Sequence, residues 1–178
     1  MARAASEAGA ARWRPQWRLW LLFGGLVVGS ITLGAIADWR DGHAFLINTT
    51  DSLSNWAFLI HRNRIPGKGD YVFFDPPASA LLRRHFGAKP QMFGKIVYGV
   101  PGDYVGHDGM DVTINGVRVA RMKPLTRFGE PLTPGATGPI PQGCYFAATP
   151  HKDGFDSRYA EIGFVCSRQI IGTGVPVL

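Results

Sequence analysis

The chain has few of the residues that bind metals or cross-link small domains. It contains two cysteines and five histidines in 178 residues. No C-x-x-C pair, zinc-ligand spacing or H-E-x-x-H pattern occurs among them. We therefore predict no metal centre and no organic cofactor.

The sequence also lacks a basic run with interleaved aromatic side chains, so a nucleic-acid partner is not predicted. The formal net charge is +6, and four of the arginines precede an apolar segment near the N-terminus. Basic residues elsewhere would favour a position near anionic lipid, and an ordinary solvated surface explains them equally well.

One long run without charge is present, at residues 19–37. Nineteen residues are about enough to cross a hydrocarbon core of roughly 30 Å. Arginines precede the run and Asp38 follows it, and the positive-inside rule places the N-terminus in the cytoplasm. We predict a cytoplasmic tail (1–18), a transmembrane anchor (19–37) and an extracytoplasmic domain (38–178). Tryptophans suited to the membrane interface occur near both ends of the run, at Trp13, Trp17, Trp20 and Trp39.

A cleaved signal sequence is the alternative to an anchor. Ala35-Ile36-Ala37 forms an A-x-A pattern of the kind that precedes a cleavage site. The run is longer than the apolar region of about 7–15 residues found in signal peptides, which favours the anchor. A buried core helix fits less well because the run has no polar face.

The remaining 140 or so residues are enough for one domain with its own core. The pattern predicts strands at 69–74 and 92–100, a hairpin around Asn115-Gly116 and one helix over 78–86. Short strands separated by frequent Gly and Pro predict a mainly β domain, either an antiparallel sandwich or an open barrel.

The two cysteines, Cys144 and Cys166, lie in predicted strands at 143–147 and 162–167. Cysteines of an exported domain can pair. If the two strands are neighbours, a disulfide closing a loop of about 22 residues would stabilise the fold by about 3 kcal/mol. Two separate buried thiols are the alternative.

Two residues suggest nucleophilic chemistry. Ser52 lies in a small, polar stretch after the apolar run, which by itself indicates only a polar loop. Lys95 lies in an apolar strand, and a lysine buried there would have a lowered pKa and could take a proton from a hydroxyl near pH 7. Alternation along the strand could equally turn Lys95 toward solvent.

An acyl-transfer site also needs donors for the oxyanion. The backbone N–H of Ser52 and the hydroxyl of Thr50 are the candidates, since Thr50 shares a side with Ser52 in an extended chain. Asp156 and Arg158 form a third candidate group. One interpretation is that the pair ties a turn to the sheet. The other is that Asp156 orients the ammonium of Lys95 or a nearby hydroxyl.

These stretches together resemble the type I signal peptidases, and within them the conjugative-transfer peptidases of the TraF type. Asn48-x-Thr50-x-Ser52 resembles the serine box of that subfamily, and Lys95 followed by Gly99-x-Pro101-Gly102-Asp103 resembles the lysine box. Asp156-Ser157-Arg158-Tyr159 is similar to the last box. The sequence departs from the TraF pattern at Ser54, Trp56 and Ile96, where proline, glycine and arginine are usual, and in the segment 148–150.

The resemblance implies a signal-peptidase-like β domain and a serine endopeptidase with Ser52 as nucleophile, Lys95 as general base, Asp156 in support and Thr50 at the oxyanion hole. It implies an exported precursor protein as partner, cleaved after a small residue. For the TraF type it implies a conjugative pilin with a cyclic product. The implied location is the bacterial inner membrane, with the domain on the periplasmic side and in reach of a secretion or conjugation apparatus.

Two other interpretations compete with the enzyme. One is a catalytically inactive, membrane-tethered assembly subunit of a secretion or conjugation apparatus, which uses the β domain for protein contacts. The other is a self-cleaving repressor, which requires a DNA-binding head that the N-terminal 38 residues are too short to supply. Ser54 is a competing nucleophile in the enzyme interpretation, although the spacing of the box favours Ser52.

Overall fold

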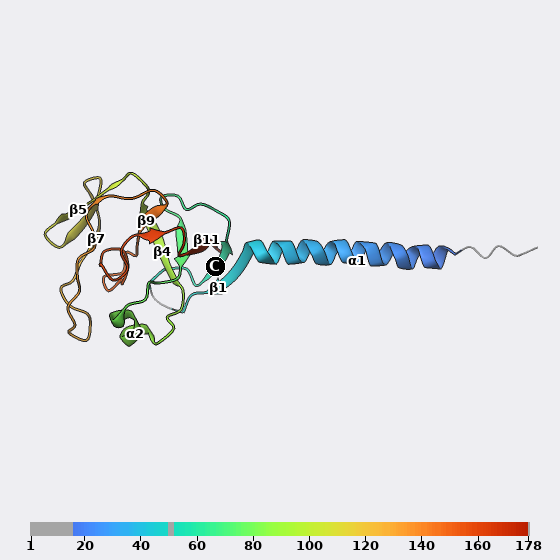
Figure 1. The fold of residues 1–178 in the computed structure, drawn as a ribbon, viewed down its shortest axis with the longest axis horizontal. Helices are drawn as coiled ribbons and strands as arrows, with labels where there is room; N and C mark the ends of the chain where they lie inside the picture. Colours follow the sequence, from blue (N-terminus) through green and yellow to red (C-terminus); the bar gives the residue numbers. More distant parts are fainter. Residues whose placement is uncertain (1–15, 50–51, 178) are drawn as a thin grey trace, which may run out of the picture. The chain divides into compact units, whose positions relative to one another are not determined.

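The structure is a computed structural model that describes residues 16–49 and 52–177. The chain divides into two compact units, one ending at Asp41 and one beginning at Gly42. The first is dominated by helix α1 (Trp17–Gly42; Figure 1). No residue of this helix is buried. By length and composition α1 could cross a membrane. It extends beyond the uncharged run 19–37 at both ends, because helical backbone hydrogen bonds do not require apolar side chains.

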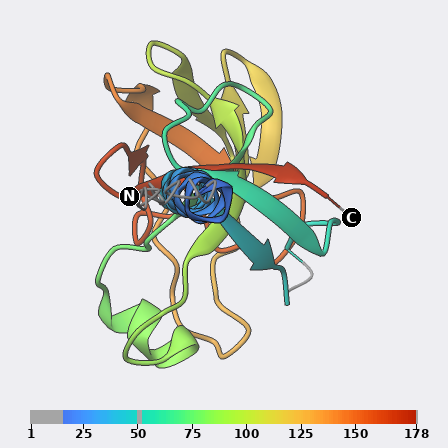
Figure 2. The same ribbon diagram turned by 90° about the vertical axis from the view of Figure 1, so that its right-hand side faces the viewer.

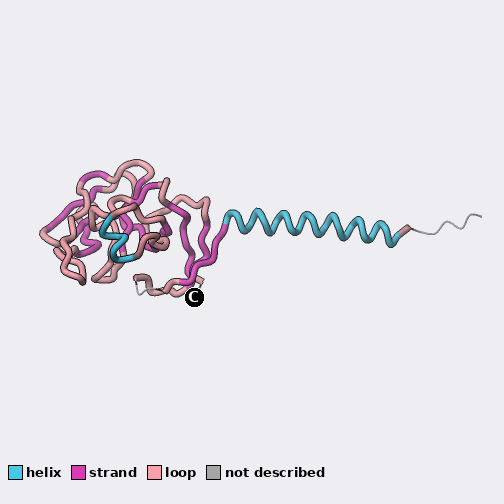
Figure 3. Tube along the Cα trace, turned by 60° about the horizontal axis from the view of Figure 1, so that its bottom comes forward, coloured by secondary structure: helices cyan, strands magenta, loops and turns pink. Residues whose placement is uncertain are grey.

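The second unit is built from strands, with α2 (Ala80–Phe86) as its one helix among the described residues (Figure 3). The strands are β1 (His43–Ile47), β2 (Ala57–His61), β3 (Tyr71–Phe74), β4 (Phe93–Gly99), β5 (Tyr104–Asp108), β6 (Asp111–Ile114), β7 (Val117–Arg121), β8 (Gly138–Pro139), β9 (Cys144–Ala148), β10 (Val165–Cys166) and β11 (Ile170–Pro176). All strand pairings are antiparallel, so the predicted mainly β, antiparallel fold is confirmed.

The strands form two sheets. The larger has the order β1-β2-β11-β3-β4-β9-β10, and the smaller has the order β7-β6-β5-β8. Strand β11, at the C-terminal end, runs between β2 and β3 although it is far from both in sequence (Figure 2). This insertion joins the N-terminal hairpin β1–β2 to the rest of the larger sheet.

The local predictions were most accurate where turn chemistry is strong. Asn115 and Gly116 have φ of 51° and 82° and connect β6 to β7, as expected for a tight hairpin turn. Helix α2 begins after Ser79, whose hydroxyl accepts the backbone N–H of Leu82. Strands β1, β2 and β11 were not predicted, because their short apolar stretches lack clear turn signals on both sides.

Cys144 and Cys166 form a disulfide. They are opposite each other on the paired strands β9 and β10. The short strand β10 is one of the two edge strands of the larger sheet, and the disulfide attaches it covalently to β9. Strand β9 leads directly into the segment that carries Thr149 and Asp156, so the cross-link strengthens the support of that segment.

Replacing both cysteines by alanine is expected to lower the free energy of unfolding by about 3 kcal/mol, because the cross-link restricts the unfolded chain. Urea denaturation of the oxidised protein and of the double variant measures the difference. Wild-type protein whose disulfide has been reduced is the control, and its free energy of unfolding should match that of the variant. Equal stability of all three samples would contradict the prediction.

Candidate active site

Lys95 faces the interior of the domain. On β4 the buried positions are Lys95, Val97 and Gly99, which alternate with partly exposed neighbours. The residue is only 5% exposed. The structure therefore decides between the two orientations that strand alternation left open, and it places the lysine on the buried side.

The surroundings of Lys95 favour its neutral form. Removal of the ammonium from water lowers the pKa of Lys95, and this is the largest effect. The negative charge of Asp156 raises the pKa, and the positive charge of Arg158 lowers it. The Nζ atom lies 5.5 Å from the centre of the Phe93 ring. A lowered pKa means that the neutral amine, which can accept a proton, forms at a lower pH than for an ordinary lysine.

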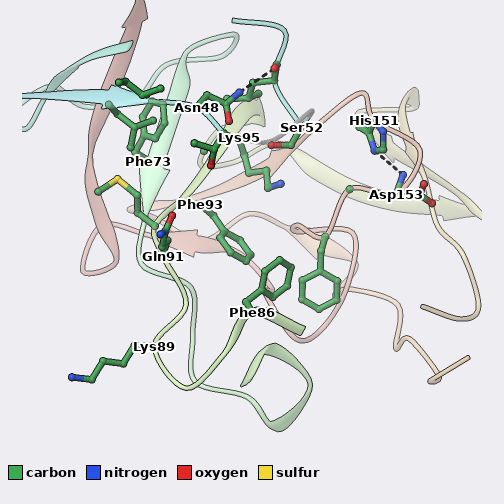
Figure 4. A pocket seen from close by; sticks show the side chains of 18 residues that line it. Asn48, Ser52, Phe73, Phe86, Lys89, Gln91, Phe93, Lys95, His151 and Asp153 are labelled. Atoms are coloured by element: carbon green, nitrogen blue, oxygen red, sulfur yellow. Dashed lines mark hydrogen bonds between the residues drawn. The ribbon is translucent and has the colours of Figure 1, made fainter. Parts of the chain in front are cut away.

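Ser52 and Lys95 line the same cleft, which has a volume of about 450 Å³. Figure 4 shows the amine of Lys95 and the hydroxyl of Ser52 both reaching into this cleft, which we call the first cleft. Its wall combines polar residues with apolar ones such as Leu53, Phe73 and Phe93. Apolar side chains beside a buried amine and a hydroxyl suit nucleophilic catalysis with a lysine base.

The loop that carries Ser52 is closed by Asn48. The backbone N–H of Asn48 donates to the carbonyl of Trp56 at 2.7 Å. Its side-chain amide donates to the carbonyls of Leu53 at 3.1 Å and Asn55 at 3.0 Å. Asn48 therefore holds both ends of the loop together at the tip of the β1–β2 hairpin. The sequence marked this residue only as part of a box.

Two groups are predicted to donate hydrogen bonds to the oxyanion. Thr50 lies outside the described residues, and its role stays a prediction. The role of the Ser52 backbone N–H also stays a prediction.

Asp156 and Arg158 form a buried ion pair. Asp156 is fully buried and Arg158 is 2% exposed. The guanidinium donates through Nε to Oδ1 at 2.8 Å and through Nη2 to Oδ2 at 2.9 Å. The carboxylate also accepts the backbone N–H groups of Arg158 and Thr149. Asp156 therefore acts on Lys95 through its charge, while its oxygens bond Arg158 and the backbone.

Thr149 connects this ion pair to the serine loop. Its hydroxyl donates to the carbonyl of Ser52, its backbone N–H donates to Asp156 at 3.0 Å, and its carbonyl accepts from Arg158 at 2.6 Å. Sequence reasoning missed Thr149 as a site residue. Its only signal was its place shortly before the Asp156 box, in a segment that departs from the family pattern.

The described residues hold no group of three or more His, Cys, Asp or Glu side chains that could bind a metal ion.

Asp156→Ala is expected to lower the free energy of unfolding by about 3–5 kcal/mol, because it leaves the guanidinium of Arg158 buried without its carboxylate. Asp111→Ala is the matched control, since Asp111 pairs with Arg118 and Arg121, whose side chains are each 62% exposed. Its loss should be about 1 kcal/mol or less. Urea denaturation compares the two, and similar losses would contradict a structural role for the buried pair.

Comparisons with known proteins identify the family of the chain. Residues 20–178 match the model of a family described as signal peptidase, peptidase S26. A signal peptidase I from Enterococcus faecalis, known from a crystal structure, is 22% identical, with a TM-score of 0.38 over 62% of this chain and 97% of that chain. No curated protein matches the chain. The match to the family model covers most of the sequence, and the chain belongs to the signal peptidase family, peptidase S26.

Proposed function

We propose that the protein is a membrane-anchored serine endopeptidase in which Ser52 is the nucleophile and Lys95 is its general base. One observation carries the proposal. The amine of Lys95 is almost completely buried, with a lowered pKa, in the cleft that Ser52 also lines. Membership of the signal peptidase family supports a peptide bond of a precursor protein as the substrate.

The reaction follows from the two side chains. Neutral Lys95 takes the proton of the Ser52 hydroxyl as Oγ forms a bond to the substrate carbonyl carbon. The resulting oxyanion is stabilised by the N–H of Ser52 and the hydroxyl of Thr50. The ammonium of Lys95 then protonates the leaving amine, and the C–N bond breaks. A water molecule, deprotonated by Lys95, releases the acyl group from Ser52.

Thr149 and the ion pair Asp156–Arg158 have a positioning role in this mechanism. The hydroxyl of Thr149 holds the Ser52 carbonyl, and Asp156 and Arg158 hold Thr149 from the other side. Positioning of this kind matters because a nucleophile displaced by about 1 Å can lose a hundredfold in rate.

The finer assignment is a conjugative-transfer peptidase of the TraF type. It is supported by the Asn48-x-Thr50-x-Ser52 box and by the aspartate at position 156. The substrate is then a pilin precursor that is cleaved after a small residue. Its own N-terminal amine takes the place of water, forms an amide bond with the acyl group as the ester bond to Ser52 breaks, and gives a cyclic product. The enzyme acts at the inner membrane with residues 38–178 in the periplasm, where it meets a conjugation apparatus. The arginine bias before the apolar run supports this orientation.

Ser52→Ala and Lys95→Ala are each expected to reduce precursor cleavage by a factor of about 10³ or more, because each removes one member of a unit that acts together. Ser54→Ala is the matched control, since Ser54 is an exposed serine of the same loop. It should cleave at the wild-type rate. The assay follows a precursor with alanine at the cleavage site, in membranes containing the full chain.

Other outcomes are equally informative. If wild-type protein and all three variants leave the precursor uncut, the assembly-subunit interpretation replaces the enzyme. If only Ser54→Ala abolishes cleavage, the nucleophile is misassigned.

The pH dependence of cleavage tests the role of Lys95 separately. Its pKa is lowered by burial, so the active neutral form predominates from a lower pH than for an ordinary lysine with a pKa of about 10.4. Below that lowered pKa, kcat/KM should fall about tenfold per pH unit as the amine becomes protonated. Lys95→Arg should be inactive throughout, because its guanidinium stays charged. An acid limb at the ordinary lysine pKa would contradict the assignment.

A further inference from the structure

A second cleft adjoins the first. It has a volume of about 330 Å³ and lies between α2, the segment 123–132 and the segment 153–159. Phe86, Asp153, Gly154 and Phe155 line both clefts. The two cavities are therefore neighbours along one shared wall, and a polypeptide bound in the first cleft can continue into the second.

Ion pairs fix the walls of the second cleft. Glu130, in the segment 123–132, pairs with His85 and with Nε of Arg84 at 3.0 Å, and this joins the segment to α2. Lys123, at the start of the same segment, pairs with Asp153. Three parts of the chain are thus tied to one another around the cavity, so the cleft is formed before any ligand enters.

The interior of the second cleft is apolar and aromatic. The ring of Phe155 stacks on that of Tyr159, with centroids 5.8 Å apart and planes at 21°. The ring of Phe86 lies 6.1 Å from that of Phe155, and Leu125 and Leu132 also line the cavity. Of the charged groups that line the cleft, Lys123, Asp153 and His85 are paired, and the guanidinium of Arg127 lies over the Phe128 ring at 4.7 Å. The aromatic and aliphatic part of the wall suits a large apolar side chain.

We propose that the second cleft binds a bulky apolar side chain of the precursor, at a position removed from the bond that is cleaved. The inference rests on the proposed function, because it takes the first cleft as the place of cleavage. An extended chain advances about 3.3 Å per residue and alternates its side chains, so one substrate can place a small residue beside Ser52 and a bulky one in the second cleft. Recognition then depends on two separated residues.

Leu125→Trp tests the proposal by filling the second cleft. Leu125 is 49% exposed and lines only the second of the two clefts, so a larger side chain there should not disturb the core. Ile65→Trp is the matched control, since Ile65 is 80% exposed and lines neither cleft. Both changes are made in the full chain carrying Ser52→Ala, in detergent micelles, so that binding is measured without cleavage.

The probes are fluorescent peptides of about twelve residues, roughly 40 Å when extended. Each contains alanine at every position except for a single phenylalanine, which is moved along the series. One peptide should bind at least about tenfold more tightly than the all-alanine peptide, because a phenylalanine side chain becomes buried. Leu125→Trp should abolish that gain, and Ile65→Trp should preserve it. The affinity of the all-alanine peptide should be the same in all three proteins.

A gain that survives Leu125→Trp, no gain at any position, or an equal loss for all peptides would overturn the proposal. A photoreactive benzoyl-phenylalanine at the preferred position gives a second measurement with the cleft unaltered. It should cross-link to residues 123–132, and attachment confined to residues 46–53 would also overturn the proposal. The binding assay does not depend on cleavage, so the two proposals can fail separately. If the protein with Ser52 intact does not cleave the precursor but still prefers the phenylalanine peptide, the peptidase assignment is wrong and the binding site in the second cleft is retained.

Discussion

The buried ion pair between Asp156 and Arg158 is the interaction on which the candidate active site depends. Two charges removed from water are favourable only when each is paired and hydrogen-bonded. Here the carboxylate bonds the guanidinium and two backbone N–H groups, and the guanidinium also bonds the carbonyls of Arg121 and Thr149. The pair therefore joins the end of β7 to the segment after β9. Through Thr149 it extends to the carbonyl of Ser52.

The same pair shapes the electrostatics around Lys95. A lone aspartate near a buried lysine would favour the ammonium and keep the amine protonated. Arg158 opposes that effect, and burial remains the largest influence on the lysine pKa. Asp156 raises the pKa of Lys95 more than Arg158 lowers it, and burial outweighs Asp156, so the pKa is lowered on balance.

The two adjoining clefts suggest how such a site selects substrates. A hydroxyl and an amine recognise only the peptide bond, so selectivity must come from the walls around them. The first cleft offers an apolar wall beside Ser52, and the second is formed by α2 and the segment 123–132. Glu130 joins these two elements through its ion pairs with Arg84 and His85, and it is not one of the residues proposed for catalysis. Substrate preference could therefore change in α2 or its partner segment while Ser52 and Lys95 stay the same.

The sequence by itself determined the apolar helix, the mainly β character of the domain, the Asn115-Gly116 hairpin and the residue types of the candidate site. Each depends on local composition, turn chemistry or a short box, and these act over a few residues. Strands β1 and β2 escaped prediction because their short apolar stretches lack clear turn signals, and β11 escaped because its partners β2 and β3 lie far away in sequence.

Only the tertiary structure decided that Lys95 faces inward, that Thr149 links the ion pair to the serine loop, and that a second cleft adjoins the first. Period-two alternation allows either face of a strand to be buried until the neighbouring strands and loops are placed. The burial that lowers the lysine pKa is likewise supplied by distant segments. Local chemistry thus provided the reactive groups, and long-range packing decided which of them share a cavity.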